Sequence, residues 1–206
     1  RLCEAMRIPV LEVAGYEADD VIGTLAHKAA AEGFEVFMVT PDKDYGQLVT
    51  DRVKIYKQKG EGVEIVDREA IKEHYGFDDP ILVRDVLALW GDASDNIPGV
   101  QGIGEKGAIK LVNQFGTVEQ ILEHTDELTP KQRANVEAGA EQLRLSKRLA
   151  SIGLDVPIEF DAEALRVEQP DTTALRKLYN ELDFNMFARE LPPDPTGLTE
   201  APAPTQ

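Results

Sequence analysis

Three short acidic clusters constrain the fold of this 206-residue chain more than any other feature of its sequence. They are YEADD, TPDKD and GDASDN, and they contain seven carboxylates: Glu17, Asp19, Asp20, Asp42, Asp44, Asp92 and Asp95. Carboxylates that are held together repel one another, and their desolvation costs several kcal/mol per ion unless a counter-charge arrives. Hard divalent cations, Mg²⁺ or Mn²⁺ before softer metals, are the usual counter-charge for oxygen ligands. The clusters therefore predict a metal-dependent site that processes phosphate groups.

The overall charge limits the kinds of partner that the chain can have. The sequence is 42% hydrophobic and 29% charged, as in a globular protein, and its formal net charge is −16. That balance argues against a generic basic nucleic-acid binder. It does not exclude a nuclease, because bound metal ions invert the local field and backbone N–H groups can contact phosphates.

Cysteine content and hydropathy indicate the compartment. Cys3 is the single cysteine, so an internal disulfide is excluded and a reducing cytosol is favoured. No apolar run approaches the roughly 20 residues that a membrane span requires, and there is no secretory signal pattern. We expect a cytoplasmic protein without a membrane partner.

The first half of the chain has the pattern of an α/β fold. A strand is expected at 9–13, a helix from Glu17 that stops at Gly33, and a strand at 35–40 that is apolar enough to be covered on both faces of a parallel sheet. A short helix is expected at 44–49, and strands at 53–56 and 63–66 form a hairpin through residues 59–62. Helices should follow at 67–75 and 80–90. Strand, helix and strand make a βαβ unit.

From Gly91 the chain is expected to be largely helical, with helices at 105–115, 117–122, 130–150 and 172–183. Thr117 and Gln120 have the spacing of a capping box. The segment 191–206 is rich in Pro and has no apolar period, which is typical of a linker or tail. The expected domains are an α/β core at 1–97, a helical region at 98–190 and the linker or tail at 191–206.

Each acidic cluster alone has an ordinary structural explanation. The first can complement a helix dipole, the second can cap a short helix, and the third can stabilise a turn. Lys43, between two of the carboxylates, can shield them or reach a phosphate, although a solvated surface lysine is the simpler interpretation. The presence of all three clusters favours a shared metal site. They are expected at one edge of the sheet, and ligands bind at the carboxyl ends of strands in an open α/β sheet.

A glycine-rich turn, Gly99 to Lys106, opens the helix expected at 105–115. Gly102 and Gly104 permit positive φ and let a phosphate approach the backbone, while Ile103 is expected to anchor the turn in the core. A tight turn without a ligand is the simpler alternative. Lys106 and Lys110 on the following helix favour a helix-hairpin-helix clamp that contacts the phosphodiester backbone and not the bases. The spacing of a Walker A loop is absent.

With these elements in hand, the chain resembles the 5′ nuclease family, which includes flap endonucleases and the 5′–3′ exonuclease domain of bacterial DNA polymerase I. The matching stretches are VAGYEADDVIGTLA, VTPDKDYGQLV, LWGDASDNIPGVQGIGEKGAIKLVNQFG and a helical region ending in ELDF. The resemblance covers about residues 8–187 and is greatest to the polymerase I type. It implies a PIN-like core with a parallel sheet, and a polymerase portion after the Pro-rich segment.

The resemblance also implies roles for individual residues. One metal ion would take Glu17 and Asp19, with Asp20 beside them, and the second would take Asp42, Asp44 and Asp92, with Asp95 in the outer shell. Glu17, Asp19, Asp42, Asp44 and Asp92 would be catalytic in a two-metal hydrolysis of DNA phosphodiesters. The DNA-binding residues would be Gly99, Gly102, Ile103, Gly104, Lys106 and Lys110, with K⁺ bridging the turn and a phosphate. The substrate would be duplex DNA with a 5′ end or 5′ flap, without base specificity, in replication and repair.

Departures from the family pattern accompany the resemblance. The family's first strand, which carries a metal-ligating Asp, and its basic arch do not precede Arg1, so the chain is expected to bind metal weakly and to cleave poorly alone. Gly107 and the pair Tyr45-Gly46 differ from the usual residues and are expected not to touch the ligands. The alternative is a non-catalytic module that binds duplex or flap DNA. A third interpretation, Asp42-Lys43-Asp44 as the D-x-D of a phosphatase or glycosyltransferase, leaves the other clusters unexplained.

Overall fold

The computed structural model describes residues 1–193, which divide into two compact units. Val13–Phe160 form the larger unit, and Arg1–Glu12 with the chain from Asp161 onward form the smaller one. The domain boundaries expected at 97/98 and 190/191 mark changes in the sequence pattern, whereas these two units are defined by spatial compactness. The expected boundaries therefore stay predictions. Most of the segment 191–206 lies outside the described residues.

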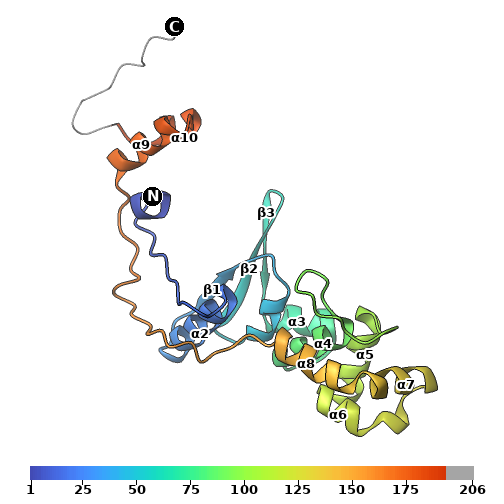
Figure 1. Cartoon of the computed structure of the whole chain (residues 1–206). Coiled ribbons are helices and arrows are strands. Elements are labelled where there is room, and N and C mark those ends of the chain that lie inside the picture. Colours follow the sequence, from blue (N-terminus) through green and yellow to red (C-terminus); the bar gives the residue numbers. More distant parts are fainter. Residues whose placement is uncertain (194–206) are drawn as a thin grey trace. The chain divides into compact units, whose positions relative to one another are not determined.

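The larger unit contains a three-stranded mixed sheet (Figure 1). Its strands are β1 (Val36–Val39), β2 (Val53–Lys59) and β3 (Gly62–Val66). β1 pairs with β2 in parallel, and β2 pairs with β3 as the predicted antiparallel hairpin. Met38 lies opposite Ile55 in the register, and both side chains are buried. Because side chains alternate between the faces of a sheet, the face that carries Met38 is the core face.

Two expectations for this sheet are wrong. Residues 9–13 form no strand, and Val10 in that segment is 72% exposed. β1 is also covered on one face only by the described elements, since Phe37 and Val39 are 47% and 76% exposed. An apolar run favours a strand, but a strand needs partners for its backbone groups, and residues 9–13 are not paired in the described sheet.

Two elements flank β1 in the sequence and carry acidic residues. The helix α2 (Ala18–Ala31) begins after Glu17, ends just before Gly33 as predicted, and packs against β1 and β2 (Figure 1). The 3₁₀ helix η1 (Asp44–Leu48) connects β1 to β2 and is entirely buried, in place of the short helix expected at 44–49. η1 also contacts α2, so these two segments with acidic residues lie next to each other.

The helices at 67–75 and 80–90 are confirmed. The helix α3 (Arg68–Tyr75) is capped by Asp67, whose carboxylate accepts a hydrogen bond from the Ala70 N–H. The 3₁₀ turn η2 (Pro80–Leu82) leads into α4 (Val83–Trp90), which contacts η1, α5 and α8. Four consecutive residues of α4, from Val86 to Leu89, are at most 1% exposed. A helix that is buried along most of its length is a core element, and α4 is the centre of this unit.

The predicted helical region follows α4. It consists of α5 (Glu105–Phe115), α6 (Val118–Glu123), the 3₁₀ turn η3 (Thr125–Glu127), α7 (Pro130–Ala138) and α8 (Ala140–Ala150). The capping box of Thr117 and Gln120 is confirmed. The single helix expected at 130–150 is wrong, because Gly139 separates α7 from α8. Glycine in a helix interior costs about 1 kcal/mol relative to alanine, which favours a break at that position.

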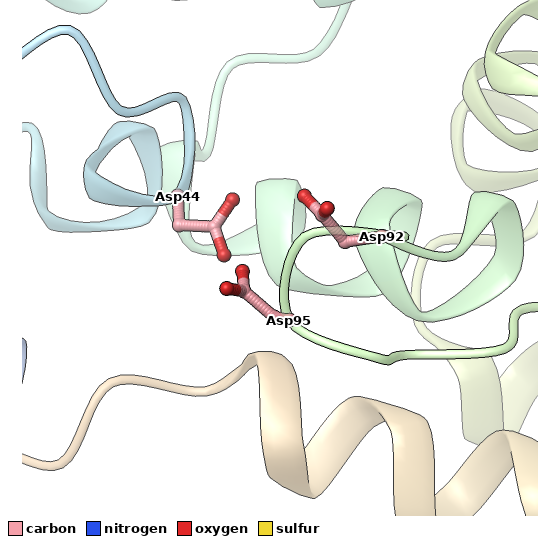
Figure 2. A group of neighbouring side chains, drawn as sticks. All are labelled: Asp44, Asp92 and Asp95. Atoms are coloured by element: carbon pink, nitrogen blue, oxygen red, sulfur yellow. The ribbon is translucent and has the colours of Figure 1, made fainter.

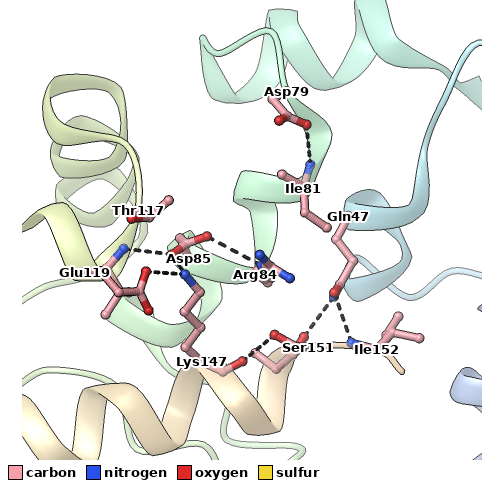
Figure 3. Close-up of polar contacts among 12 residues, drawn as sticks. Gln47, Asp79, Ile81, Arg84, Asp85, Thr117, Glu119, Lys147, Ser151 and Ile152 are labelled. Carbon is pink, nitrogen blue, oxygen red and sulfur yellow. Dashed lines mark hydrogen bonds and ion pairs between the residues drawn. The ribbon is translucent and has the colours of Figure 1, made fainter. Parts of the chain in front are cut away.

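A buried ion pair fastens the helical region to α4 (Figure 3). The carboxylate of Asp85, which is fully buried in α4, lies 2.7 Å from the ammonium of Lys147 in α8. It also accepts the N–H of Val118 at the start of α6, at 2.8 Å. Lys147 pairs in addition with Glu119 of α6 at 2.6 Å. These contacts hold three helices together around one charged centre.

The smaller unit contains α1 (Leu2–Ala5), α9 (Thr172–Glu181) and α10 (Asn185–Glu190). α1 packs against α9, and Arg1 pairs with Glu181. The helix expected at 172–183 is confirmed up to Glu181, whereas α10 was not predicted. Within residues 1–193, the helices are too short or too polar to cross a lipid bilayer.

Candidate active site

Asp44, Asp92 and Asp95 form an acidic trio at the junction of η1 and the loop after α4 (Figure 2). Each contributes a carboxylate oxygen to a group whose atoms all lie within 4.8 Å of one another. Asp44 and Asp92 are 7% exposed, whereas Asp95 is exposed. Such a group of oxygens matches the ligand set that Mg²⁺ and Mn²⁺ prefer.

The loop after α4 brings Asp92 and Asp95 to this position. Gly91 ends α4 with φ of +84°, a conformation that favours glycine, and Asp92 then pairs with Ile97 through two backbone hydrogen bonds. The Asp92 carboxylate accepts hydrogen bonds from the N–H and the hydroxyl of Ser94. This tight closed loop carries Asp95 on the side that faces Asp44 (Figure 2).

Lys43 supplies positive charge to the trio. Its ammonium is hydrogen-bonded to Asp92 and lies 3.7 Å from Asp44. The contact with Lys43, aided by the Ser94 hydrogen bonds, lowers the pKa of Asp92 to about 2. In Asp44 burial dominates, and with the repulsion of Asp42 it raises the pKa of that carboxyl to about 6.

One oxygen of Asp44 shows that the trio fits a cation. Oδ1 of Asp44 is buried, and no hydrogen-bond donor reaches it within the described residues. Buried polar atoms almost always have a partner, and each exception needs an explanation. A metal ion would satisfy this atom and also offset the repulsion among the three carboxylates.

Asp42 stands beside the trio and shapes its backbone. Its carboxylate accepts the N–H of Asp44 at 3.0 Å, and its own N–H donates to the hydroxyl of Thr40 at 3.1 Å. The sequence allowed a cap of the short helix here, but the N-cap of η1 is Lys43 without a side-chain cap, and Asp42 instead stabilises the turn that precedes η1. The half-buried side chain of Asp42 also adds negative potential at Asp44.

The first acidic cluster is divided between different environments. Asp19 accepts a hydrogen bond from the hydroxyl of Tyr45 at 2.7 Å, which places it next to η1. Asp20 accepts the backbone N–H of Gly153 at 2.7 Å, a contact that ties α2 to the segment after α8. Glu17 occupies the N-cap of α2 and is exposed, with no hydrogen bond to the helix backbone. Within the described part of the chain, these residues lie outside the group of oxygens formed by Asp44, Asp92 and Asp95.

Sequence reasoning missed one functional candidate, Tyr45, and for a second, Lys43, it preferred the simpler interpretation to the one in which this lysine shields the carboxylates. Tyr45 was expected not to touch the ligands, and its contact with Asp19 makes that expectation wrong. The signal was a tyrosine directly after Asp44, whose hydroxyl can donate to a nearby carboxylate. Lys43 was considered a solvated surface lysine, whereas its side chain is 35% exposed and bonded to Asp92.

The glycine-rich turn joins the same loop to α5. Ile103 is 5% exposed, so the predicted apolar anchor is confirmed. Gly102 uses the positive φ that glycine permits, at +77°, whereas Gly104 has φ of −91° and is the N-cap of α5. A Cβ atom at Gly104 would meet nothing within 4 Å. Its backbone is therefore open to a ligand.

The other residues of the turn differ in what they offer. Gly99 is required by packing, because a Cβ there would lie 2.5 Å from the carbonyl oxygen of Trp90. The side chain of Asn135 in α7 donates to the carbonyl of Gln101 at 2.7 Å and fixes the turn. Lys106 and Lys110 are exposed and one helical turn apart on α5. Together with Gly102 and Gly104 they form an exposed edge of backbone and positive charge.

Comparison with known proteins agrees with this geometry. Residues 1–76 match the family model described as 5′-3′ exonuclease, N-terminal resolvase-like domain. Residues 79–173 match that of 5′-3′ exonuclease, C-terminal SAM fold. An α/β core followed by a helical region is thus the fold of the family, as predicted.

Relatives of known name and structure give the same result. The chain is 38% identical to DNA polymerase I of Chloroflexus aurantiacus over all of its length, and 44% identical to thermostable DNA polymerase I of Thermus filiformis over 92% of it. It spans 24% and 22% of those two proteins. The T5 D15 protein, crystallised with metal ions, is 26% identical with a TM-score of 0.65, covering 73% of this chain and 55% of that one. The chain therefore belongs to the 5′-3′ exonuclease family.

Proposed function

We propose that this chain is the structure-specific 5′–3′ exonuclease and flap endonuclease part of a DNA polymerase I-like protein, acting in DNA replication and repair. The observation that carries the proposal is the acidic trio with its unsatisfied Asp44 oxygen, in a chain of this family. Since the chain spans about a quarter of its named relatives, a fused polymerase portion is part of the proposal. So is a cytoplasmic location, which the single cysteine supports.

The trio is proposed to hold one divalent ion, Mg²⁺ or Mn²⁺, through Asp44 and Asp92, with Asp95 and Asp42 adjacent. Asp19 and Glu17 are proposed for a second ion, and the bond between Asp20 and Gly153 favours a structural role for Asp20 over direct coordination. When bound, such paired ions would supply a nucleophilic hydroxide and would stabilise the leaving oxygen of a phosphodiester. The protein contributes the placement of these carboxylates and the exclusion of bulk water around Asp44.

The glycine-rich turn is proposed to grip duplex DNA next to a 5′ end or 5′ flap. Gly102 and Gly104 leave room for a phosphate at the backbone, Lys106 and Lys110 supply charge, and a K⁺ ion can bridge the turn and the phosphate. Gly99 and Ile103 hold the shape of the turn. Backbone contacts of this kind carry no base specificity. We keep the division at 97/98 between the catalytic core and this DNA-binding region as part of the proposal.

The proposal is tested with the whole protein on a 5′-flap substrate in Mg²⁺. Asp92→Ala and Asp44→Ala should lower the cleavage rate by at least about 10²-fold, because misplaced metal ligands cost that much or more. DNA affinity measured in Ca²⁺ should change little. The control is Asp126→Ala, which removes the same charge from η3 in the helical region.

Two results would contradict the proposed function. Cleavage by Asp92→Ala at the unmodified rate would remove the trio from the chemistry. Tight binding of flap DNA without any metal-dependent cleavage, in the unmodified protein, would favour the non-catalytic binding module instead.

A further inference from the structure

We propose that Lys43 is a resident counter-cation of the acidic trio, and that a divalent ion must displace it from Asp92 in order to bind. Lys43 would thereby set the metal concentration at which the site fills. This inference rests on the proposed function and deepens it, since it concerns the regulation of the same metal site.

The contacts of Asp92 carry the inference. Its Oδ1 accepts hydrogen bonds from the N–H and hydroxyl of Ser94, and its Oδ2 accepts the ammonium of Lys43. The two hydrogen bonds to Oδ1 use both lone pairs of that oxygen, whereas the single contact with Lys43 leaves one lone pair on Oδ2. A divalent ion at Oδ2 would lie beside the ammonium, and the repulsion between the two cations favours displacement of Lys43.

The two donors differ in how easily they can be exchanged. The Ser94 contacts belong to the closed loop from Asp92 to Ile97, so losing them would open its backbone. Lys43 reaches Oδ2 through a flexible four-carbon stem, and its side chain is 35% exposed against 6% for Asp92. The exchangeable ligand of Asp92 is therefore Lys43.

Asp44 and Trp90 lie where they can assist the replacement of the Lys43 ammonium by a metal ion. The ammonium lies 3.7 Å from Oδ1 of Asp44, close enough for attraction but without a hydrogen bond, so this oxygen is ready for an incoming ion. The same ammonium lies 5.6 Å from the centre of the Trp90 ring. A cation within about 6 Å of an indole face is attracted to it, so Trp90 offers the displaced ammonium a nearby place.

The test measures Mn²⁺ binding to the whole protein without DNA, by calorimetry and by the electron paramagnetic resonance signal of the free ion. Lys43→Met keeps the length of the stem and removes the charge, and it should tighten Mn²⁺ binding by about tenfold, as expected for the loss of a charged hydrogen bond that competes with the metal. Lys43→Gln is the second neutral variant. Lys43→Arg keeps the charge and should stay near the unmodified protein.

The matched control is Lys59→Met, which removes an identical charge from a side chain 69% exposed at the end of β2. Its Mn²⁺ affinity should not change, so that net charge is separated from the local contact. In EDTA, the Lys43→Met protein should have a lower Tm than the unmodified protein, because the trio loses its counter-charge. Saturating Mn²⁺ should raise the Tm of Lys43→Met more than that of the unmodified protein.

Two different failures can be told apart. In the first, the unmodified protein binds Mn²⁺, but Lys43→Met and Lys43→Gln both bind it no more tightly than the unmodified protein does. That result would overturn the proposal that Lys43 is a counter-cation and would leave the proposed metal site intact. If no variant, including the unmodified protein, binds Mn²⁺, the metal site itself is wrong and the counter-cation proposal falls with it.

Discussion

The hydroxyl of Tyr45 donates a hydrogen bond of 2.7 Å to Oδ1 of Asp19, joining the first turn of η1 to the first turn of α2. Two acidic clusters that are far apart in the sequence are thus linked by one neutral donor. Burial, and then the bond to Asp19, raise the pKa of Tyr45 well above its usual range, so that the phenol keeps its proton. We therefore predict that Tyr45 holds Asp19 in place as a positioning residue of the proposed metal site.

Tyr45→Phe should loosen Asp19 without opening the core. We expect the affinity for Mn²⁺ and the rate of flap cleavage to fall by about tenfold, the lower end of the range for partners that orient metal ligands. The Tm should change little, because the ring still fills its place. Tyr56→Phe on β2 is the control, and equal effects of the two substitutions would contradict a role for the Asp19 contact.

The ion pair of Asp85 and Lys147 should dominate the stability of the helical region. Asp85→Ala leaves the ammonium of Lys147 without its buried partner, and breaking a buried pair in this way costs about 3–5 kcal/mol of unfolding free energy. Urea denaturation measures the change. Glu119→Ala, which removes the more exposed partner of Lys147, should cost about 1 kcal/mol or less. A similar loss in both variants would mean that burial does not distinguish the two carboxylates.

Asp44 should make stability in EDTA depend on pH. Its pKa in the folded protein is about 6, above the ordinary value of 3.8, so between these values the folded chain binds a proton that the unfolded chain does not. Stability should therefore rise as the pH falls from about 6 to 4, by at most about 3 kcal/mol. The pKa of Asp92 is lowered to about 2, so its contribution is lost only below pH 4.

Urea denaturation at pH 6.5, 5.5 and 4.5 checks this expectation. Asp44→Asn should be less dependent on pH over this range than the unmodified protein and more stable at pH 6.5. Saturating Mg²⁺ should also flatten the profile of the unmodified protein, because a bound cation keeps Asp44 ionised. Identical profiles for the unmodified protein and Asp44→Asn would show that Asp44 titrates normally.

Local signals in the sequence were sufficient for much of the fold. The helix at 105–115, the hairpin of β2 and β3, and the cap of Thr117 with Gln120 depend on residues close together in the chain. Local patterns of this kind are sufficient to predict the helix, hairpin or cap that they form. Each acidic cluster also lies where the sequence placed it, at the start of α2, between β1 and η1, and after α4.

What the sequence could not supply depends on distant contacts. Residues 9–13 have the apolar side chains of a strand but are not paired in the described sheet, and the exposed face of β1 at Phe37 and Val39 has no described element on it. The helix expected at 130–150 is divided at Gly139 into α7 and α8. In the candidate site, the bond of Asp20 to Gly153 joins residues 133 positions apart, and no local pattern reveals it.

The glycine-rich turn allows a test of DNA binding that is separate from folding. A side chain at Gly104 would meet no atom within 4 Å, so Gly104→Val should fold normally. If phosphates approach this backbone, the valine should weaken duplex binding by about tenfold or more, and equally for unrelated sequences, since backbone contacts do not read bases. Gly62→Val, on the surface of β3, is the control.

Gly102→Val should weaken duplex binding and also lower the Tm, because φ of +77° costs a side chain about 1–2 kcal/mol. Fluorescence anisotropy with two duplexes of unrelated sequence measures the affinities. A loss of affinity confined to one of the duplexes would contradict a backbone clamp, and unchanged affinity in Gly104→Val would remove the turn from the DNA interface.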